Sequence, residues 1–159
     1  MSTENKIIIG GAVLTILAIV GISIILSNNS STPSSVPEDQ IVVRQGLHWH
    51  PRLEIYINGE KQEFTDSIGL GAVHQKMHTH REDYKDGVVH MEMEGLVTKD
   101  QTRLGNFFRI WGKEFNSTQI FDNKNSSEGT VKMAVNSKDN TDFENYQMKD
   151  GDLIIIRYE

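Results

Sequence analysis

The chain has 159 residues, a net charge of −6 and no cysteine. Its length suits one domain with short attachments, and the lack of cysteine excludes disulfides, thiolate zinc sites and iron–sulfur clusters. Because nucleic-acid binding needs clustered Lys and Arg, an acidic chain without a basic patch argues against nucleic acid as a partner.

The first predicted element is an apolar segment near the N-terminus. Residues 7–26 carry no charged side chain over twenty positions, the length that an α-helix needs to cross a bilayer. Lys6 precedes the segment and no Lys or Arg follows it before Arg44, which favours a cytoplasmic N-terminus. We therefore predict a single-pass anchor in residues 1–26, with the membrane as partner and the remainder extracytoplasmic. A cleaved signal peptide is the alternative.

Residues 27–40 hold two of the three prolines and almost no apolar side chain, so they are predicted to form a flexible linker. The domain proper is predicted to span residues 41–159. Its clearest element is a β-hairpin: residues 52–57 alternate between apolar and polar, Asn58-Gly59 matches a type I′ turn, and a return strand follows.

One short helix is predicted between Thr102 and Trp111. Thr102 is the expected N-cap and Gly112 the expected C-terminal stop. An apolar face for core packing follows from the spacing of Leu104, Phe107, Phe108 and Trp111.

The C-terminal part returns to predicted strands, at residues 118–121, 130–135 and 152–158. The last of these contains a continuous apolar run, typical of a strand covered on both faces. The order of hairpin, helix and strands resembles the β-grasp topology. The predicted fold class is therefore mainly β with one short α-helix, an α+β fold that is β-grasp-like, preceded by a single transmembrane helix.

All six histidines of the chain fall between residues 48 and 90. Side chains two apart on a strand share a face, so His48 and His50 form one pair of imidazoles, and His78 and His80 form another. A lone histidine is more often structural than a ligand, but two such pairs in one short segment favour a metal site.

A third set of polar side chains follows on the next predicted strand. His90, Glu92 and Glu94 share one face, whereas Met91 and Met93 lie on the other and are expected in the core. The predicted ligands are His48, His50, His78, His80 and His90, with Glu92 as a ligand or as a carboxylate that orients an imidazole. His74 is the least certain histidine, and Trp49 is expected opposite His48 and His50.

Four imidazoles suit tetrahedral zinc, and three or four with an open position suit copper or non-haem iron. Met77, Met91 and Met93 would favour Cu⁺ only if their sulfurs faced the site. We expect copper or zinc, with iron the weaker candidate.

The segment HWHPRLEIYING, followed by MHTH, DGVVHME and TRLGNFFRIWG, resembles an uncharacterised family of exported archaeal and bacterial domains. The resemblance covers residues 46–113 and implies no established activity. Arg81 stands where that family often has Asp, which removes a carboxylate from this position.

A second resemblance concerns His48, His50 and Glu54, whose spacing is similar to the first metal-binding motif of cupins. The second cupin motif is missing. If the resemblance holds, it implies that two histidines and one glutamate bind one metal ion.

Three function classes follow from these patterns. The first is a membrane-anchored metal-binding module for copper or zinc capture, delivery or electron transfer, with an extracytoplasmic protein as possible partner. The second is a metalloenzyme, either a cupin-like oxidase or oxygenase or a zinc hydrolase, with Glu54, Glu92 or Glu94 as general base. The third is an interaction domain switched by histidine protonation.

Overall fold

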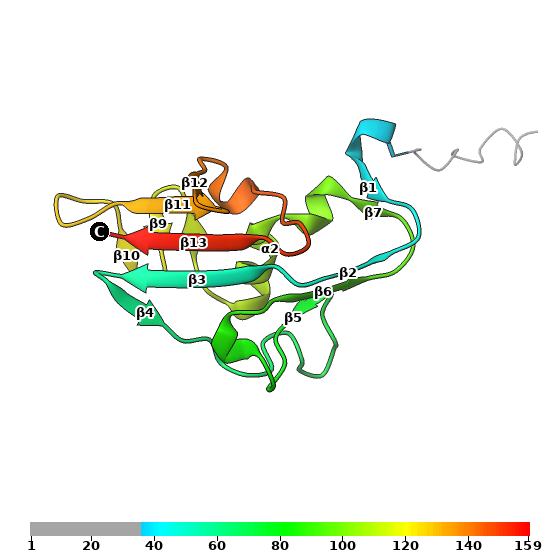
Figure 1. The fold of residues 1–159 in the computed structure, drawn as a ribbon, viewed down its shortest axis with the longest axis horizontal. Coiled ribbons are helices and arrows are strands. Elements are labelled where there is room, and N and C mark those ends of the chain that lie inside the picture. The colour runs from blue at the N-terminus through cyan, green and yellow to red at the C-terminus, as the bar shows by residue number, and fades with distance from the viewer. Residues whose placement is uncertain (1–35) are drawn as a thin grey trace, which may run out of the picture. The chain divides into compact units, whose positions relative to one another are not determined.

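A five-stranded mixed sheet is the largest feature of the computed structural model, which describes residues 36–159 (Figure 1). β13 lies in the middle of this sheet, parallel to β3 on one side and antiparallel to β11 on the other. In spatial order its strands are β12 (Lys138–Asp139), β11 (Val131–Val135), β13 (Leu153–Tyr158), β3 (Arg52–Ile57) and β4 (Glu60–Gln62). The last strand, β13, is thus inserted beside β3 of the first hairpin, and a helix lies between them in the sequence.

The predicted fold class needs one correction. It included a transmembrane helix, but no helix within residues 36–159 is long and apolar enough to cross a membrane. The predicted anchor, residues 7–26, lies outside the described residues. The described part of the chain is therefore an α+β fold, mainly β with one α-helix.

The predicted hairpin is confirmed. β3 and β4 pair antiparallel with Ile57 opposite Glu60. Asn58 and Gly59 in the turn have φ values of 51° and 85°. Two successive residues with positive φ are what a type I′ turn requires, and Asn followed by Gly tolerates that backbone best.

The helix α2 (Leu104–Trp111) ends at Gly112, whose φ of 71° is left-handed, as the sequence predicts. Its start differs from the prediction. A 3₁₀ helix, η3 (Lys99–Thr102), precedes it, and the Thr102 hydroxyl donates to the carbonyl of Lys99 instead of capping α2. The N-cap prediction for Thr102 is therefore wrong.

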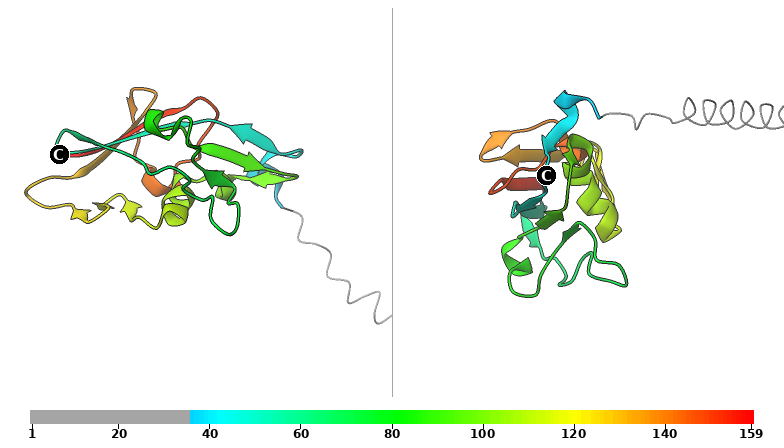
Figure 2. Two further views of the ribbon diagram at one scale, coloured as in Figure 1. Left: turned by 90° about the horizontal axis from the view of Figure 1, so that it is seen from below. Right: turned by 90° about the vertical axis from the view of Figure 1, so that its right-hand side faces the viewer.

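One face of the sheet and the apolar face of α2 enclose the core, and the right-hand view of Figure 2 shows the helix on one side of the strands. Phe107 and Phe108 of the helix are buried together with Ile154 and Ile156 of β13. The other face of β13, with Ile155, is only partly covered. The sequence predicted that both faces of this strand are covered. This is confirmed for the face with Ile154 and Ile156 and wrong for the face with Ile155.

A second, three-stranded antiparallel sheet carries the histidines. Its order is β2 (Leu47–Trp49), β6 (His90–Met93) and β5 (Met77–His78). His48 stands opposite Glu92, and His78 stands opposite His90. Because β2 leads into β3 across Pro51, this sheet is fixed to the start of the central one.

Short elements complete the described residues. β1 (Ile41–Val43) pairs with β7 (Val97–Thr98). A small antiparallel sheet contains β8 (Phe115–Asn116), β9 (Gln119–Ile120) and β10 (Asn123–Lys124). The remaining 3₁₀ helices are η1 (Glu38–Gln40), η2 (Tyr84–Asp86) and η4 (Phe143–Asn145).

Candidate metal centre

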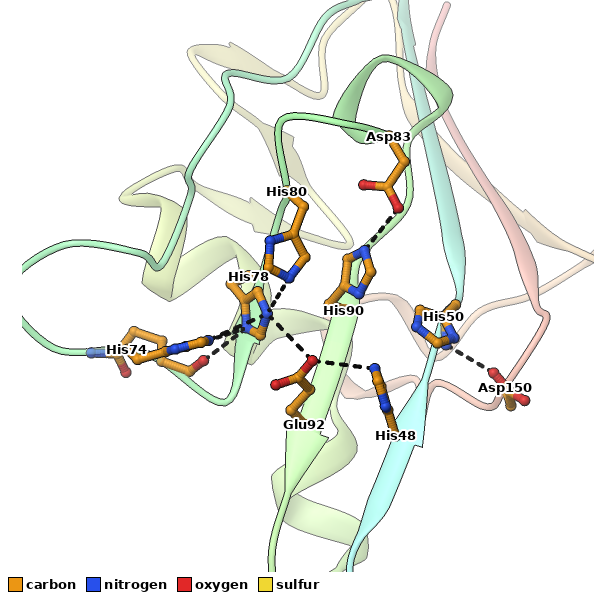
Figure 3. A network of polar contacts seen from close by, with 10 residues as sticks. His48, His50, His74, His78, His80, Asp83, His90, Glu92 and Asp150 are labelled. Carbon is orange, nitrogen blue, oxygen red and sulfur yellow. Dashed lines mark hydrogen bonds and ion pairs between the residues drawn. The ribbon is translucent and has the colours of Figure 1, made fainter.

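The histidine-bearing sheet has two chemically different faces. Strand alternation and register place His48, Glu92, His90 and His78 on one face (Figure 3). The opposite face presents Leu47, Trp49, Met77, Met91 and Met93 to the core. The predictions for Met91, Met93 and Trp49 are thus confirmed, and no methionine of this sheet offers its sulfur to the histidines.

His78, His80, His90 and Glu92 form what we call the inner group. Each of the four offers one ligand atom, and these atoms all lie within 4.8 Å of one another. His78 Nε2 is 3.1 Å from His80 Nε2 and 3.9 Å from Glu92 Oε1. The side chain of His78 is completely buried. This group can hold a metal ion.

His48, His50 and His90 form a second set, the outer group, whose ligand atoms also lie within 4.8 Å of one another. His48 and His50 are exposed. His48 Nε2 lies 3.2 Å from Glu92 Oε1, so the two groups meet at Glu92 as well as at His90. Five predicted histidine ligands and Glu92 are therefore brought together.

Thr79 fixes the direction of the two side chains next to it, His78 and His80. Its buried hydroxyl donates to the carbonyl of Thr65 over 3.2 Å and accepts from the backbone N–H of Ile68 over 3.0 Å. Because Thr79 points into the core, His78 and His80 on either side of it point to the opposite side, the face that they share with His90 and Glu92.

The tautomer of His78 follows from its contact with the backbone. His78 Nδ1 lies 3.0 Å from the carbonyl oxygen of Gln75, which only accepts, so Nδ1 carries the proton and Nε2 keeps its lone pair. Burial lowers the pKa of His78, and this effect outweighs the hydrogen bond to Gln75, which raises it. The imidazole is therefore held neutral, the form that binds metal ions.

Asp83 does for His90 what Gln75 does for His78. His90 Nε2 lies 2.8 Å from Asp83 Oδ2, so its N–H donates a hydrogen bond to that carboxylate and the lone pair of Nδ1 stays free to bind a metal ion. The sequence shows Asp83 close after Arg81, but nothing in it assigned this carboxylate to His90. Arg81 is exposed and faces Asp66 at 3.6 Å, whereas the carboxylate that contacts His90 lies two residues later.

Asp150 is a second missed residue. Its Oδ1 accepts a hydrogen bond of 2.8 Å from the backbone N–H of His50, across 100 positions of sequence. The contact ties the end of β2 to the turn before β13 and so limits where the His50 ring lies. No local pattern in the sequence indicated this partner for Asp150.

His74 lies closer to the site than the sequence indicated. Its Nε2 is 3.3 Å from His78 Nδ1 and 3.4 Å from His78 Nε2, although the residue is exposed and outside both groups. It reaches this place from a loop that bridges to Leu70, not from a helix.

Glu54 is not at the site. It accepts a hydrogen bond of 2.9 Å from the Tyr56 hydroxyl and faces Lys61 at 3.6 Å. Neither potential ligand group in residues 36–159 contains it. The spacing that resembles a cupin motif therefore does not bring this glutamate to His48 and His50.

The arrangement is thus a set of oriented nitrogen and carboxylate donors at one end of the fold, beside an open cleft of about 610 Å³ that His48, His74 and Glu92 help to line. Comparison of the chain with protein-family models, curated proteins and solved structures gives no match.

Proposed function

We propose that this protein binds a transition-metal ion, Cu²⁺ or Zn²⁺, through its inner group. The observation that carries the proposal is the convergence of three imidazoles and one carboxylate, with ligand atoms within 4.8 Å of one another. The hydrogen bonds from His78 to Gln75 and from His90 to Asp83 support it, since metal-binding imidazoles commonly use their second nitrogen in this way.

The donor types favour these two ions. Three nitrogens and one oxygen suit tetrahedral zinc, and the affinity order of divalent ions for such donors places Cu²⁺ first. Soft sulfur ligands, which would favour Cu⁺, do not face the histidines, because Met77, Met91 and Met93 are buried in the core. Iron is the weaker fit, because Fe²⁺ stands below both ions in that order.

The role we propose is capture of the ion and its delivery to a partner protein. A purely structural ion is normally closed off by its four ligands. Here the exposure differs within the inner group: the side chain of His78 is fully buried, whereas that of Glu92 is 41% exposed. This exposure supports exchange of the ion with the surroundings. Electron transfer is the other role compatible with copper, and reversible reduction of the loaded protein would distinguish it.

The direct test is metal retention. The purified chain, stripped with chelator and loaded with Cu²⁺ or Zn²⁺, is expected to keep at least one equivalent through desalting, as measured by elemental analysis. His80→Ala removes a partly buried ligand and should weaken binding by about 100-fold, whereas Glu54→Gln, which changes a glutamate outside both groups, should bind as the wild type does. Failure of the wild type to retain any ion contradicts the proposal.

A second candidate function, a zinc hydrolase, is favoured by the cleft beside the site. Its lining includes His48, Glu92 and Glu94, so a small substrate has room next to a bound ion and a potential general base. The zinc-loaded protein would then hydrolyse activated esters faster than the zinc-loaded Glu94→Gln variant. Equal rates would leave metal capture as the better account.

A further inference from the structure

The face with the histidines has more donors than one ion uses. Six imidazoles and Glu92 gather there, whereas tetrahedral zinc takes four ligands (Figure 3). We propose that the face holds two metal ions side by side, with Glu92 as the carboxylate between them. This inference rests on the proposed function and extends it from one ion to a binuclear centre.

His90 decides how the donors divide. Both groups include it, but its Nε2 is engaged with Asp83 at 2.8 Å, so only Nδ1 remains and one lone pair binds one ion. With two ions present, His90 completes the outer set, which otherwise has only His48 and His50. The inner ion then keeps His78, His80 and Glu92.

His74 lies beside the inner donors but outside their group. Two donors bound to one ion at about 2.0–2.1 Å with a tetrahedral angle stand roughly 3.3 Å apart. His74 Nε2 is 3.4 Å from His78 Nε2, and His80 Nε2 is 3.1 Å from the same atom. The spacing of His78 and His80 therefore fits one ion, and the inner ion takes His78, His80 and Glu92 from the chain, with one tetrahedral position left open.

Glu92 lies between the two sets of imidazoles, as a bridging carboxylate would. Its Oε1 is 3.2 Å from His48 Nε2 on the outer side and 3.9 Å from His78 Nε2 on the inner side. A carboxylate has two oxygens and can give one to each ion, and ions paired in this way are about 3.5–4 Å apart. The same side chain thus contacts an imidazole of each set.

The two positions differ in exposure. The side chain of His48 is 61% exposed, that of His90 13%, and that of His78 is completely buried. An ion at the outer position therefore exchanges faster with a chelator, and the inner ion is released last. The carboxylates of Glu92 and Asp83 offset part of the added positive charge.

Stoichiometry tests the inference with two matched double variants of the whole chain. Wild type should bind two equivalents of Zn²⁺, while His48→Ala/His50→Ala and His78→Ala/His80→Ala should each bind one, by elemental analysis and titration calorimetry. Because His78 is buried, circular dichroism checks folding, and His80→Ala alone replaces the inner variant if that variant unfolds. One equivalent in the wild type overturns the two-ion inference and leaves the proposed function standing. No retained ion at all overturns both.

The bridge is tested separately with copper. Two Cu²⁺ ions joined by a carboxylate couple magnetically, so the fully loaded wild type should show an EPR signal well below two spins per chain. The outer double variant should show one full spin. Glu92→Gln should restore most of the missing signal, whereas Glu94→Gln, its neighbour on the strand, should not. A full two-spin signal in the wild type overturns the bridged arrangement.

Discussion

At the scale of single residues, the candidate metal site depends on groups that belong to neither set of potential ligands. His78 is held by the carbonyl of Gln75 and His90 by the carboxylate of Asp83. Each contact decides which ring nitrogen keeps its lone pair. The donor set is therefore oriented before any ion arrives, which lowers the entropic cost of binding.

Asp83→Ala should weaken metal binding by about 10–100-fold, because the ring of His90 loses the acceptor that fixes its tautomer. Competition against a chromophoric chelator measures this change. Asp66→Ala is the control, since Asp66 faces Arg81 and not a histidine. Equal affinities for the two variants would show that Asp83 does not orient the site.

Thr79→Val should destabilise the fold by about 1–3 kcal/mol, because valine has the same shape but leaves the amide of Ile68 and the carbonyl of Thr65 without their buried partner. Urea unfolding of the metal-free protein gives the free energy. Thr130→Val, at an exposed position, should change it by less than about 0.5 kcal/mol. A similar loss in both variants would contradict the role assigned to the Thr79 hydroxyl.

At the scale of elements, the turn before β13 connects the central sheet to the histidines. Asp152 accepts hydrogen bonds from the backbone of Lys149, the amide of Asn136 and the hydroxyl of Tyr146, at 2.8, 2.9 and 2.8 Å. The turn that Asp152 holds also carries Asp150, which contacts His50. A polar network outside the site thus keeps β2 in place.

This network predicts a pH dependence of stability. Burial, followed by the hydrogen bond to Asp152, raises the pKa of Tyr146 above its usual value of 10.0. Above about pH 10 the unfolded chain loses this proton while the folded chain keeps it, so the free energy of unfolding falls as pH rises. Urea unfolding between pH 9 and 11 should show a steeper fall for the wild type than for Tyr146→Phe.

Tyr84→Phe controls for the loss of one tyrosine in this experiment and should keep the slope of the wild type. If Tyr146→Phe keeps that slope too, the fall has another origin.

The elements that sequence predicted well are those with a local period or a local turn signal. The β3–β4 hairpin follows from alternation and Asn58-Gly59, and the face shared by His90 and Glu92 follows from alternation alone. Asp83 and the Gln75 carbonyl escaped prediction because they lie in irregular segments, where spacing does not fix direction. Thr102 was misassigned because a 3₁₀ turn precedes α2, and no periodicity in the sequence distinguishes the two helix types.

At the scale of the whole molecule, the parallel pair β3–β13 joins residues from the two ends of the domain. The order of elements indicated a β-grasp arrangement, but the pairing partners were beyond local sequence signals. The buried face of β13 packs under the helix, and the site lies where β2 leads into β3. β3 pairs with β13 and directly follows β2, so this strand links the stability of the core to the geometry of the site.

Ile154→Ala should destabilise the fold by about 2–5 kcal/mol, because the side chain is fully buried and leaves a cavity. Ile155→Ala, its neighbour on the half-covered face, should cost less than half as much. Urea unfolding of the metal-free variants measures both. Equal costs would mean that the two faces of β13 are equally packed.

The pairing of β3 with β13 also sets an order of events during synthesis. His50 leaves the ribosome 100 residues before Asp150. The strand β3 is likewise synthesised long before its neighbour β13. Translation proceeds at about 5–20 residues per second, so the histidines spend seconds without the strand that frames them. A nascent chain that stops before β13 presents imidazoles without a defined geometry. Under the proposed function, selective metal loading is therefore expected after translation of β13, as a step that follows folding.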